Sequence, residues 1–327
     1  MSPLAETQKV EHLAQIRDAA VRIKGQVRRT PLLRTDISPG LMVKPESLQV
    51  TGSFKARGAF NAVLSLLERD PRVAGVVTHS SGNHGQALAC AAKSVGLPAT
   101  VVVPEGVTPA KVAGIRSYGA TVVSDGVNFD NRESVAEEIA RTQQLWLIHP
   151  YDDWDVVHGA GTVGLEILED VPTPGAVVVP VGGGGQISGI ALALSALSPA
   201  TAIIGVEPEG AADAAASLHS GALQSLDSDP VTIAEGVKSK SIGDRNFDVI
   251  VAAGLVRDIV TVSESELKEA VRVAWTRLKL AIEPTAALAL AAYLTGKVPA
   301  GSAERPTVLV LSGGNFDPAA VASLLTA

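Results

Sequence analysis

Short runs of β-branched residues alternate with longer Ala/Leu-rich segments, and this rhythm constrains the fold more than any other feature. Eight runs are predicted to be buried strands: Val73–Thr78, Ala99–Val103, Ala120–Ser124, Leu145–His149, Ala176–Val181, Ala202–Val206, Asp258–Val262 and Thr307–Leu311. Helical patterns lie between most of them, among them Gly85–Val95, Ala110–Tyr118, Arg132–Thr142 and Glu264–Leu280. Such alternation is typical of mostly parallel sheets covered by helices on both faces. We therefore expect an α/β fold whose ligand sites lie beyond the carboxyl ends of the strands.

Composition and charge exclude several classes of protein. The chain has 327 residues, of which 46% are hydrophobic and 19% charged, as in a folded enzyme of one large or two moderate domains. Its net charge of −7, without a basic cluster, argues against nucleic-acid binding. The apolar runs are shorter than the ~20 residues of a membrane span, and the first residues do not resemble a secretory signal. With Cys90 as the single cysteine, we expect a cytoplasmic protein that binds no membrane.

Four consecutive glycines separate a predicted strand from an apolar helical segment. Gly182, Gly183, Gly184 and Gly185 follow the run that ends at Val181. Successive glycines let backbone N–H groups converge, and the start of a helix adds positive potential. The spacing does not fit a dinucleotide fingerprint, and the Lys-Ser/Thr pair of a P-loop is absent. We interpret the segment as a phosphate cradle, because a simple tight turn would need only one or two glycines.

A lysine stands between a Gly-Ser turn and the start of a helix, in Thr51-Gly52-Ser53-Phe54-Lys55-Ala56-Arg57-Gly58. In this position Lys55 is shielded enough to lose its proton and form a Schiff base with an aldehyde. Phe54 is placed to pack beside a flat ring. Taken alone, Lys55 would be interpreted as an exposed surface lysine.

Two further polar motifs end predicted strands. The segment Thr78–Gln86 contains Ser80, Ser81, Asn83 and His84. Its hydroxyls, amide and helix-start N–H groups are suited to binding a carboxylate, although His84 alone would also serve as a core or capping histidine. In Leu311-Ser312-Gly313-Gly314-Asn315, the Ser312 hydroxyl is placed to donate to a pyridine nitrogen and leave it uncharged.

In this order, the four motifs resemble those of the fold-type II pyridoxal-phosphate enzymes, the family of threonine and serine dehydratases and serine racemase. The resemblance runs from Arg29-Thr30-Pro31-Leu32 to Asn315. It implies pyridoxal 5′-phosphate as cofactor and a two-lobed, tryptophan synthase β-like fold. Residues 1–51 and 146–327 would form a large cofactor-binding domain, and residues 52–145 a small, mobile substrate-binding domain. We also expect a homodimer that acts on a small amino acid.

The resemblance assigns roles to single residues. Lys55 would carry the cofactor, and Gly182 to Gly185 would bind its phosphate. Phe54 would flank the ring, Asn83 would contact the ring oxygen, Ser312 the ring nitrogen, and Glu283 would lie near the cofactor. The residues expected to bind substrate are Ser80, Ser81, Asn83, His84, Arg132 and Ser239.

Two features are similar to the branch that contains serine racemase and threo-3-hydroxyaspartate dehydratase. Ser81 stands where threonine deaminases carry alanine, and in this branch the serine faces the side of the cofactor opposite the lysine. Glu207, Asp213 and the Ala211 carbonyl match a divalent-cation site with the oxygen ligands that Mg²⁺ or Ca²⁺ prefer. Without the resemblance, these acids would be interpreted as solvated loop residues.

Other positions leave the substrate open. Arg132 matches an arginine that recognises an acidic substrate group in this branch, although a surface role is nearly as plausible, and Ser239 is a weaker candidate for the same task. Ala160 stands where the family usually carries glutamine, and the loop Arg34–Met42 is shorter than usual.

Three functions therefore remain. The first is an ammonia-lyase (dehydratase) that converts serine, threonine or 3-hydroxyaspartate to a 2-oxo acid and ammonia. The second is an amino-acid racemase with Lys55 and Ser81 as its two acid–base groups. The third is a phosphate-binding or regulatory protein that keeps the fold without catalysis.

Overall fold

Two sheets organise the computed structural model, which describes residues 5–80 and 82–326. The larger sheet has the order β1 (Leu33–Arg34), β2 (Leu41–Pro45), β10 (Thr307–Leu311), β7 (Ala176–Pro180), β8 (Ala202–Pro208) and β9 (Asp258–Val262). The smaller sheet has the order β5 (Thr121–Val123), β4 (Ala99–Val102), β3 (Val76–His79) and β6 (Trp146–Leu147). Every pairing is parallel except β1 with β2. The predicted α/β fold class is therefore confirmed.

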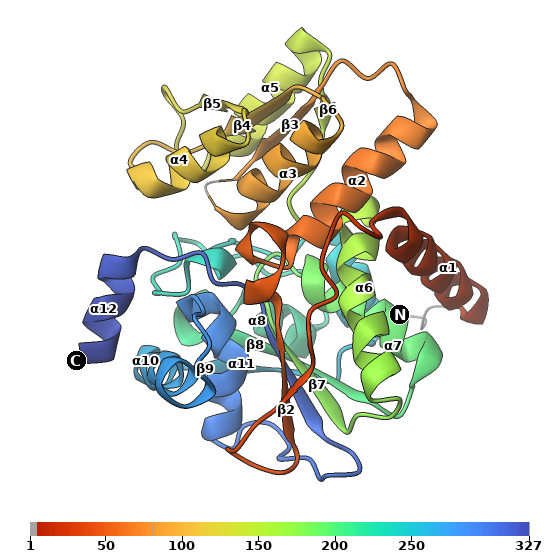
Figure 1. The fold of residues 1–327 in the computed structure, drawn as a ribbon, viewed down its shortest axis with the longest axis vertical. Coiled ribbons are helices and arrows are strands. Elements are labelled where there is room, and N and C mark those ends of the chain that lie inside the picture. The colour runs from red at the N-terminus through yellow and green to blue at the C-terminus, as the bar shows by residue number, and fades with distance from the viewer. Residues whose placement is uncertain (1–4, 81, 327) are drawn as a thin grey trace.

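Helices surround both sheets and leave two lobes that are visible in Figure 1. In the upper lobe of that view, the smaller sheet lies with α2 (Lys55–Arg69), α3 (Asn83–Ser94), α4 (Pro109–Ser117) and α5 (Arg132–Gln143). The remaining helices are α1 (Glu6–Arg22), α6 (Trp154–Asp170), α7 (Gly185–Leu197), α8 (Asp213–Ser220), α9 (Asp244–Phe247), α10 (Glu264–Val273), α11 (Pro284–Leu294) and α12 (Pro318–Thr326). Short helical turns cover Glu46–Leu48, Val50–Gly52, Glu209–Ala211, Glu235–Val237, Asp248–Ala252 and Ala274–Leu278.

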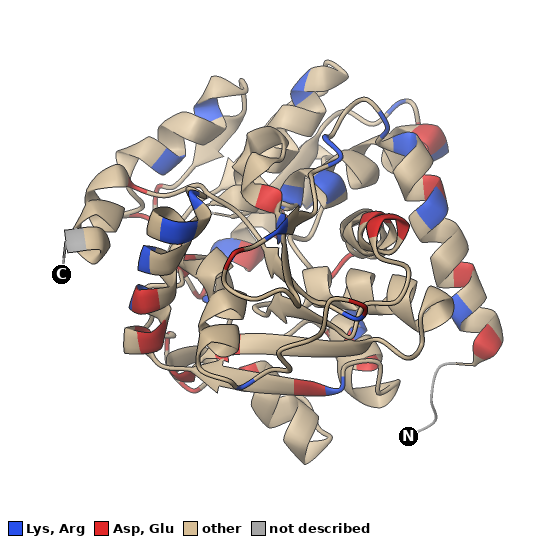
Figure 2. Cartoon of the chain, turned by 60° about the horizontal axis from the view of Figure 1, so that its bottom comes forward, with Lys and Arg blue, Asp and Glu red and all other residues tan. Residues whose placement is uncertain are grey.

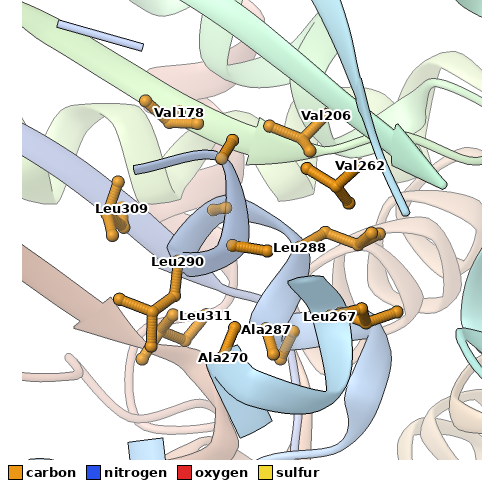
Figure 3. Packing of buried hydrophobic residues seen from close by; sticks show 14 of the residues in the cluster. Val178, Val206, Val262, Leu267, Ala270, Ala287, Leu288, Leu290, Leu309 and Leu311 are labelled. Carbon is orange, nitrogen blue, oxygen red and sulfur yellow. The ribbon is translucent and has the colours of Figure 1, made fainter. Parts of the chain in front are cut away.

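The larger sheet is apolar on both faces because its strands lie between two layers of helices. Val178 on β7 packs with Val206, Leu288 and Leu309 on the face covered by α10 and α11 (Figure 3). Its neighbour Val177 belongs to a second core with α6 and α7 on the other face. Successive side chains of a strand point to opposite faces, so a strand buried on both faces is a continuous apolar run.

The helices α6 and α7 approach closely because small residues face one another. A Cβ atom on Gly189 would lie 2.2 Å from the Val157 carbonyl oxygen and 2.6 Å from the Gly161 nitrogen. The start of α6 is capped by Asp153, whose carboxylate accepts hydrogen bonds from the N–H groups of Asp155 (2.8 Å) and Val156 (3.3 Å). These contacts fix the segment that leads from the smaller sheet into α6.

One detail differs from the sequence-based expectation. The segment Arg34–Met42, expected to be a loop, contains the end of β1 and the start of β2. The apolar pattern of β2 is interrupted by Lys44 and Pro45, although both are buried. The predicted strand Leu145–His149 is present as β6, which pairs with β3. The expected division into two domains near residue 145 stays a prediction.

Charged residues of both signs are interspersed over the helices in Figure 2. Within residues 5–80 and 82–326, no helix is both long enough and apolar enough to cross a membrane.

Candidate active site

Lys55 is the first residue of α2 and its amine faces the segment before α6. Its Nζ donates a hydrogen bond of 2.6 Å to the Pro150 carbonyl. Removal of water from this amine by the surrounding protein lowers the pKa of Lys55 to about 8. A larger fraction of the amine is therefore neutral near pH 7 than for an ordinary lysine, and a neutral amine is a nucleophile and a base.

The turn before Lys55 lies against the end of β10. The Phe54 N–H donates to the Ser312 carbonyl (3.0 Å), and Ser53 forms an isolated bridge with Gly313. The Phe54 ring centroid lies 5.2 Å from Lys55 Nζ. The Ser312 hydroxyl is buried and has no hydrogen-bond partner among the described residues. Two motifs far apart in the sequence thus meet at the carboxyl end of β10.

A chain of amides and one carboxyl group joins the other motifs to this place. Asn315 Nδ2 donates to the Thr51 carbonyl (2.6 Å) and to Asn83 Oδ1 (2.8 Å). Asn83 Nδ2 in turn donates to Glu283 Oε1 at 2.8 Å. Burial raises the pKa of Glu283 to about 7. The structure therefore brings Asn83 and Glu283 to the end of the sheet that carries Ser312.

The glycine loop begins α7 and is too crowded for side chains. A Cβ atom on Gly183 would lie 2.2 Å from the Tyr151 ring, and one on Gly184 would lie 2.7 Å from Asn246. Gly184 also has a φ of 92°, which glycine tolerates and other residues avoid. The loop is braced by Asn246, whose Nδ2 donates to the carbonyls of Gly183 (2.8 Å) and Tyr151 (3.0 Å). Tyr151 and Asn246 belong to no motif that the sequence analysis recognised.

The segment before α3 supplies polar groups at the end of β3. Ser80 Oγ accepts a hydrogen bond from the Gly82 N–H at 3.3 Å. His84 is buried, and burial lowers its pKa well below the usual value, so the ring is neutral. Ser81 lies outside the described residues, so its expected role stays a prediction.

Arg132 begins α5 and stacks on Phe129, with its guanidinium carbon 3.9 Å from the ring centroid. Among the described residues, this guanidinium has no hydrogen bond or ion pair, and burial lowers its pKa. Its charge also acts on Tyr151 at the glycine loop. Ser239 is buried, and its Oγ has no partner in the described part of the chain. Both groups are thus free to bind a ligand.

The carboxylate next to Arg132 is engaged elsewhere. Glu133 Oε1 lies 3.3 Å from His149 Nε2, and His79 lies beside this pair, so that ligand atoms of all three residues are within 4.8 Å of one another. The His149 Nδ1 accepts the N–H of Asp152 at 2.8 Å, so Nε2 carries the ring proton and donates to Glu133. We interpret the group as a hydrogen-bonded cluster, because a metal would need the lone pair of that Nε2.

The predicted cation ligands lie near the end of β8, in the turn after it and at the start of α8. Glu207 is fully buried, and its two oxygens accept the N–H groups of Ala214 (3.0 Å) and Ala215 (2.8 Å). Burial, together with Asp213, raises the pKa of Glu207 to about 8. Burial also raises the pKa of Asp213 to about 7; nearby N–H groups offset this only in part, and neither oxygen makes a hydrogen bond among the described residues. Burial makes the charged form of both carboxyl groups unfavourable, and a bound cation would offset this because it stabilises the carboxylates. Ala211, whose carbonyl is the third expected ligand, lies between them in the sequence.

The groups around Lys55 complement those of pyridoxal phosphate. A glycine loop at a helix start suits its phosphate, a lysine of lowered pKa suits its aldehyde, and the unpaired Ser312 hydroxyl suits its ring nitrogen. The chain's own residues therefore fit this cofactor.

Comparison with known proteins agrees with this chemistry. The family model for "Pyridoxal-phosphate dependent enzyme" matches residues 23–313, and the chain belongs to this family.

Individual relatives are similar over nearly the whole chain. Serine racemase from Homo sapiens is 43% identical over 314 residues, covering 93% of this chain and 91% of that protein. L-threo-3-hydroxyaspartate ammonia-lyase from Pseudomonas sp is 42% identical over 312 residues, covering 94% of this chain and 96% of that protein. The crystal structure of threonine deaminase from T.th. has a TM-score of 0.86 and 44% identity, covering 93% of this chain and 98% of that chain.

Proposed function

We propose that the chain is a pyridoxal-phosphate-dependent ammonia-lyase that converts a β-hydroxy amino acid to a 2-oxo acid and ammonia. The observation that carries the proposal is the pairing of a lysine base with a serine, rather than an acid, at the end of β10. The Ser312 hydroxyl has no partner in the described part of the chain, and a hydroxyl leaves a ring nitrogen uncharged, which favours expulsion of a β-hydroxyl group over other fates.

The proposed reaction uses the cofactor, Lys55 and two binding segments. Pyridoxal phosphate, when bound, takes up the electron pair left as the Cα–H bond breaks. Lys55 Nζ accepts the Cα proton and becomes an ammonium group. The segment of Ser80, Ser81 and His84 binds the substrate carboxylate, and the glycine loop binds the cofactor phosphate. Loss of the β-hydroxyl as water, followed by hydrolysis, releases the 2-oxo acid and ammonia.

Mg²⁺ or Ca²⁺ would be held by Glu207, Asp213 and the Ala211 carbonyl. Its role would be to neutralise two buried carboxyl groups, and thereby to stabilise the connection between β8 and α8. A homodimer in the cytoplasm also remains a prediction.

The substrate we favour has an acidic side chain. The partly buried guanidinium of Arg132 has no ion-pair partner within residues 5–80 and 82–326, and a carboxylate is the group that such a donor binds best. This supports 3-hydroxyaspartate ahead of serine and threonine, and a similar protein is named as an ammonia-lyase for L-threo-3-hydroxyaspartate.

The test is an amino-acid panel scored for both the 2-oxo acid and the D-isomer, in the wild type and in Arg132→Leu. Loss of a charged hydrogen bond costs about 2 kcal/mol, so we expect kcat/KM for L-threo-3-hydroxyaspartate to fall roughly 30-fold. The value for L-serine should change less than about threefold, since it lacks the second carboxylate.

The matched control is Arg141→Leu on the same helix, because Arg141 is exposed and paired with Glu138. Equal losses for both substrates in Arg132→Leu would remove the acidic-substrate proposal.

The second candidate is racemisation at the same site. It is favoured by the similarity to serine racemases and by a serine at position 81, which would supply a proton from the face opposite Lys55. A panel that yields D-isomer and no 2-oxo acid would replace the first proposal with this one.

A further inference from the structure

A small cavity adjoins Lys55. Its walls are formed by Phe54, Lys55, Gly58, Pro150, Val156, Ala160, Gly185 and Gln186, so it borders both the turn before the lysine and the start of α7. The cavity has a volume of about 10 Å³. A single water molecule needs roughly 10–15 Å³ and two to four polar partners, so the space is the size of one water.

Gln186 is the unusual residue of this wall. It is the second residue of α7, is only 5% exposed, and its Nε2 has no hydrogen-bond partner among the described residues. An amide buried without a partner is costly, whereas a leucine would fill the same wall without that cost. Ala160 lines the same cavity, at the position where the family resembled usually carries glutamine.

We propose that the cavity holds one water molecule, bound by Gln186 and hydrogen-bonded to Lys55, and that Gln186 is thereby a positioning residue for the lysine. The inference deepens the proposed function, because it rests on Lys55 as the base. In this chain the cavity therefore has an amide from position 186 and a methyl group at position 160.

A second acceptor beside Lys55 suits the proposed reaction. When Lys55 removes the substrate proton, the Cα–H bond breaks, an N–H bond forms, and the amine becomes an ammonium with an additional donor. Pro150 accepts one of its N–H groups at 2.6 Å. The water oxygen accepts a second, while it also accepts the Gln186 Nε2–H. The water therefore stabilises the charged form of Lys55 that surrounding apolar atoms disfavour.

The direct test compares Lys55 titration in the wild type with that in Gln186→Leu, which removes the amide and keeps most of the volume. Competitive acetylation of the full-length, cofactor-free chain, read by mass spectrometry, gives the pH dependence of each lysine. We expect the midpoint for Lys55 to fall by about one pH unit, a tenfold change in its protonation equilibrium, because an acceptor for the ammonium is lost. Exposed Lys93 serves as the internal control and should not move.

Two further variants separate positioning from general packing. Ala160→Val fills the cavity and leaves the amide, so it should shift Lys55 in the same direction. The double variant Ala160→Gln/Gln186→Leu returns an amide to the cavity from position 160 and should restore at least half of the shift. In the loaded enzyme, kcat should follow these shifts, while KM changes less than about twofold because no substrate contact is altered.

An unchanged Lys55 midpoint in both Gln186→Leu and Ala160→Val would overturn the inference, as would a loss of thermal stability without any shift. If Gln186→Leu does not fold, Ala160→Val and the double variant decide the question by the same midpoint. A midpoint shift in a protein that turns over none of the panel would contradict the proposed function and leave the water site standing.

Discussion

Lys55, Asn83 and Ser312 are recognisable in the sequence because each lies in a short motif at a strand end or helix start. The structure brings their segments together through Asn315 and Glu283, and their roles toward the cofactor stay predictions. Tyr151, Asn246 and Gln186 had no comparable signal. Their importance comes from burial and from neighbours distant in sequence, which no local pattern contains.

Ser81 tests the two catalytic candidates at this scale. Racemisation requires a proton donor on each face of a planar carbon, and Lys55 serves one face only. In Ser81→Ala, we expect D-isomer formation from L-serine to fall at least tenfold more than 2-oxo acid formation, a typical loss for one acid–base group. The measurement is the rate of both products in the two proteins. Ser80→Ala is the matched control, since it removes a neighbouring hydroxyl.

If the two products fall equally in Ser81→Ala, the serine acts in binding or in departure of the hydroxyl group. The racemase candidate would then lose its second acid–base group.

At the scale of elements, the β8–α8 connection combines a strand, a short helical turn and a helix start around two carboxyl groups. The pKa of Glu207 is raised to about 8 and that of Asp213 to about 7. Without a cation, the folded chain therefore binds more protons than the unfolded chain between about pH 4 and pH 8, and its stability falls as pH rises through this window. A cation requires the charged carboxylates, so its affinity rises over the same range.

We accordingly expect Mg²⁺ or Ca²⁺ to raise the midpoint of thermal unfolding by a few degrees at pH 8, and less at pH 6, with chelator reversing the effect. Asp213→Asn should abolish the difference, whereas Glu209→Gln, an exposed neighbour, should preserve it. If neither the ion nor the chelator changes the midpoint of thermal unfolding at pH 8, then Glu207 and Asp213 bind no cation.

Element boundaries show where sequence patterns stop being informative. The eight predicted strands are all present, and most of them are buried runs rich in β-branched residues, although β5 and β6 are short and partly exposed. β2 was missed because Lys44 is buried in it, with Nζ donating to the Thr30 carbonyl (2.6 Å) and to Glu166 (2.5 Å). In the sequence alone, a buried lysine whose charge is neutralised by residues distant in the chain cannot be distinguished from a surface lysine. The predicted helix Glu264–Leu280 is α-helical only as far as Val273 and continues as a wider helical turn over Ala274–Leu278. Lys279, with a φ of 57°, ends this turn.

At the scale of the molecule, the site lies where the two lobes meet, with Asn83 at the start of α3 bonded to Glu283 at the start of α11. α2 carries Lys55 and packs on α3 and α6, while the glycine loop and Ser312 come from the larger sheet. The alternation of strands and helices was sufficient to predict this class of fold, since buried parallel strands need helices on both faces. The contacts between the lobes were not predictable, because they depend on side chains brought together only by the complete fold.

The central claim is that Lys55 carries pyridoxal phosphate. The most direct measurement is borohydride reduction of the protein loaded with pyridoxal phosphate, followed by peptide mass mapping. In the wild type we predict a single modified residue, Lys55. A folded Lys55→Ala variant should show neither modification nor turnover. The Lys93→Ala variant should keep both the modification of Lys55 and the turnover. A reduced cofactor on another lysine, or full turnover in Lys55→Ala without added amine, would contradict the account.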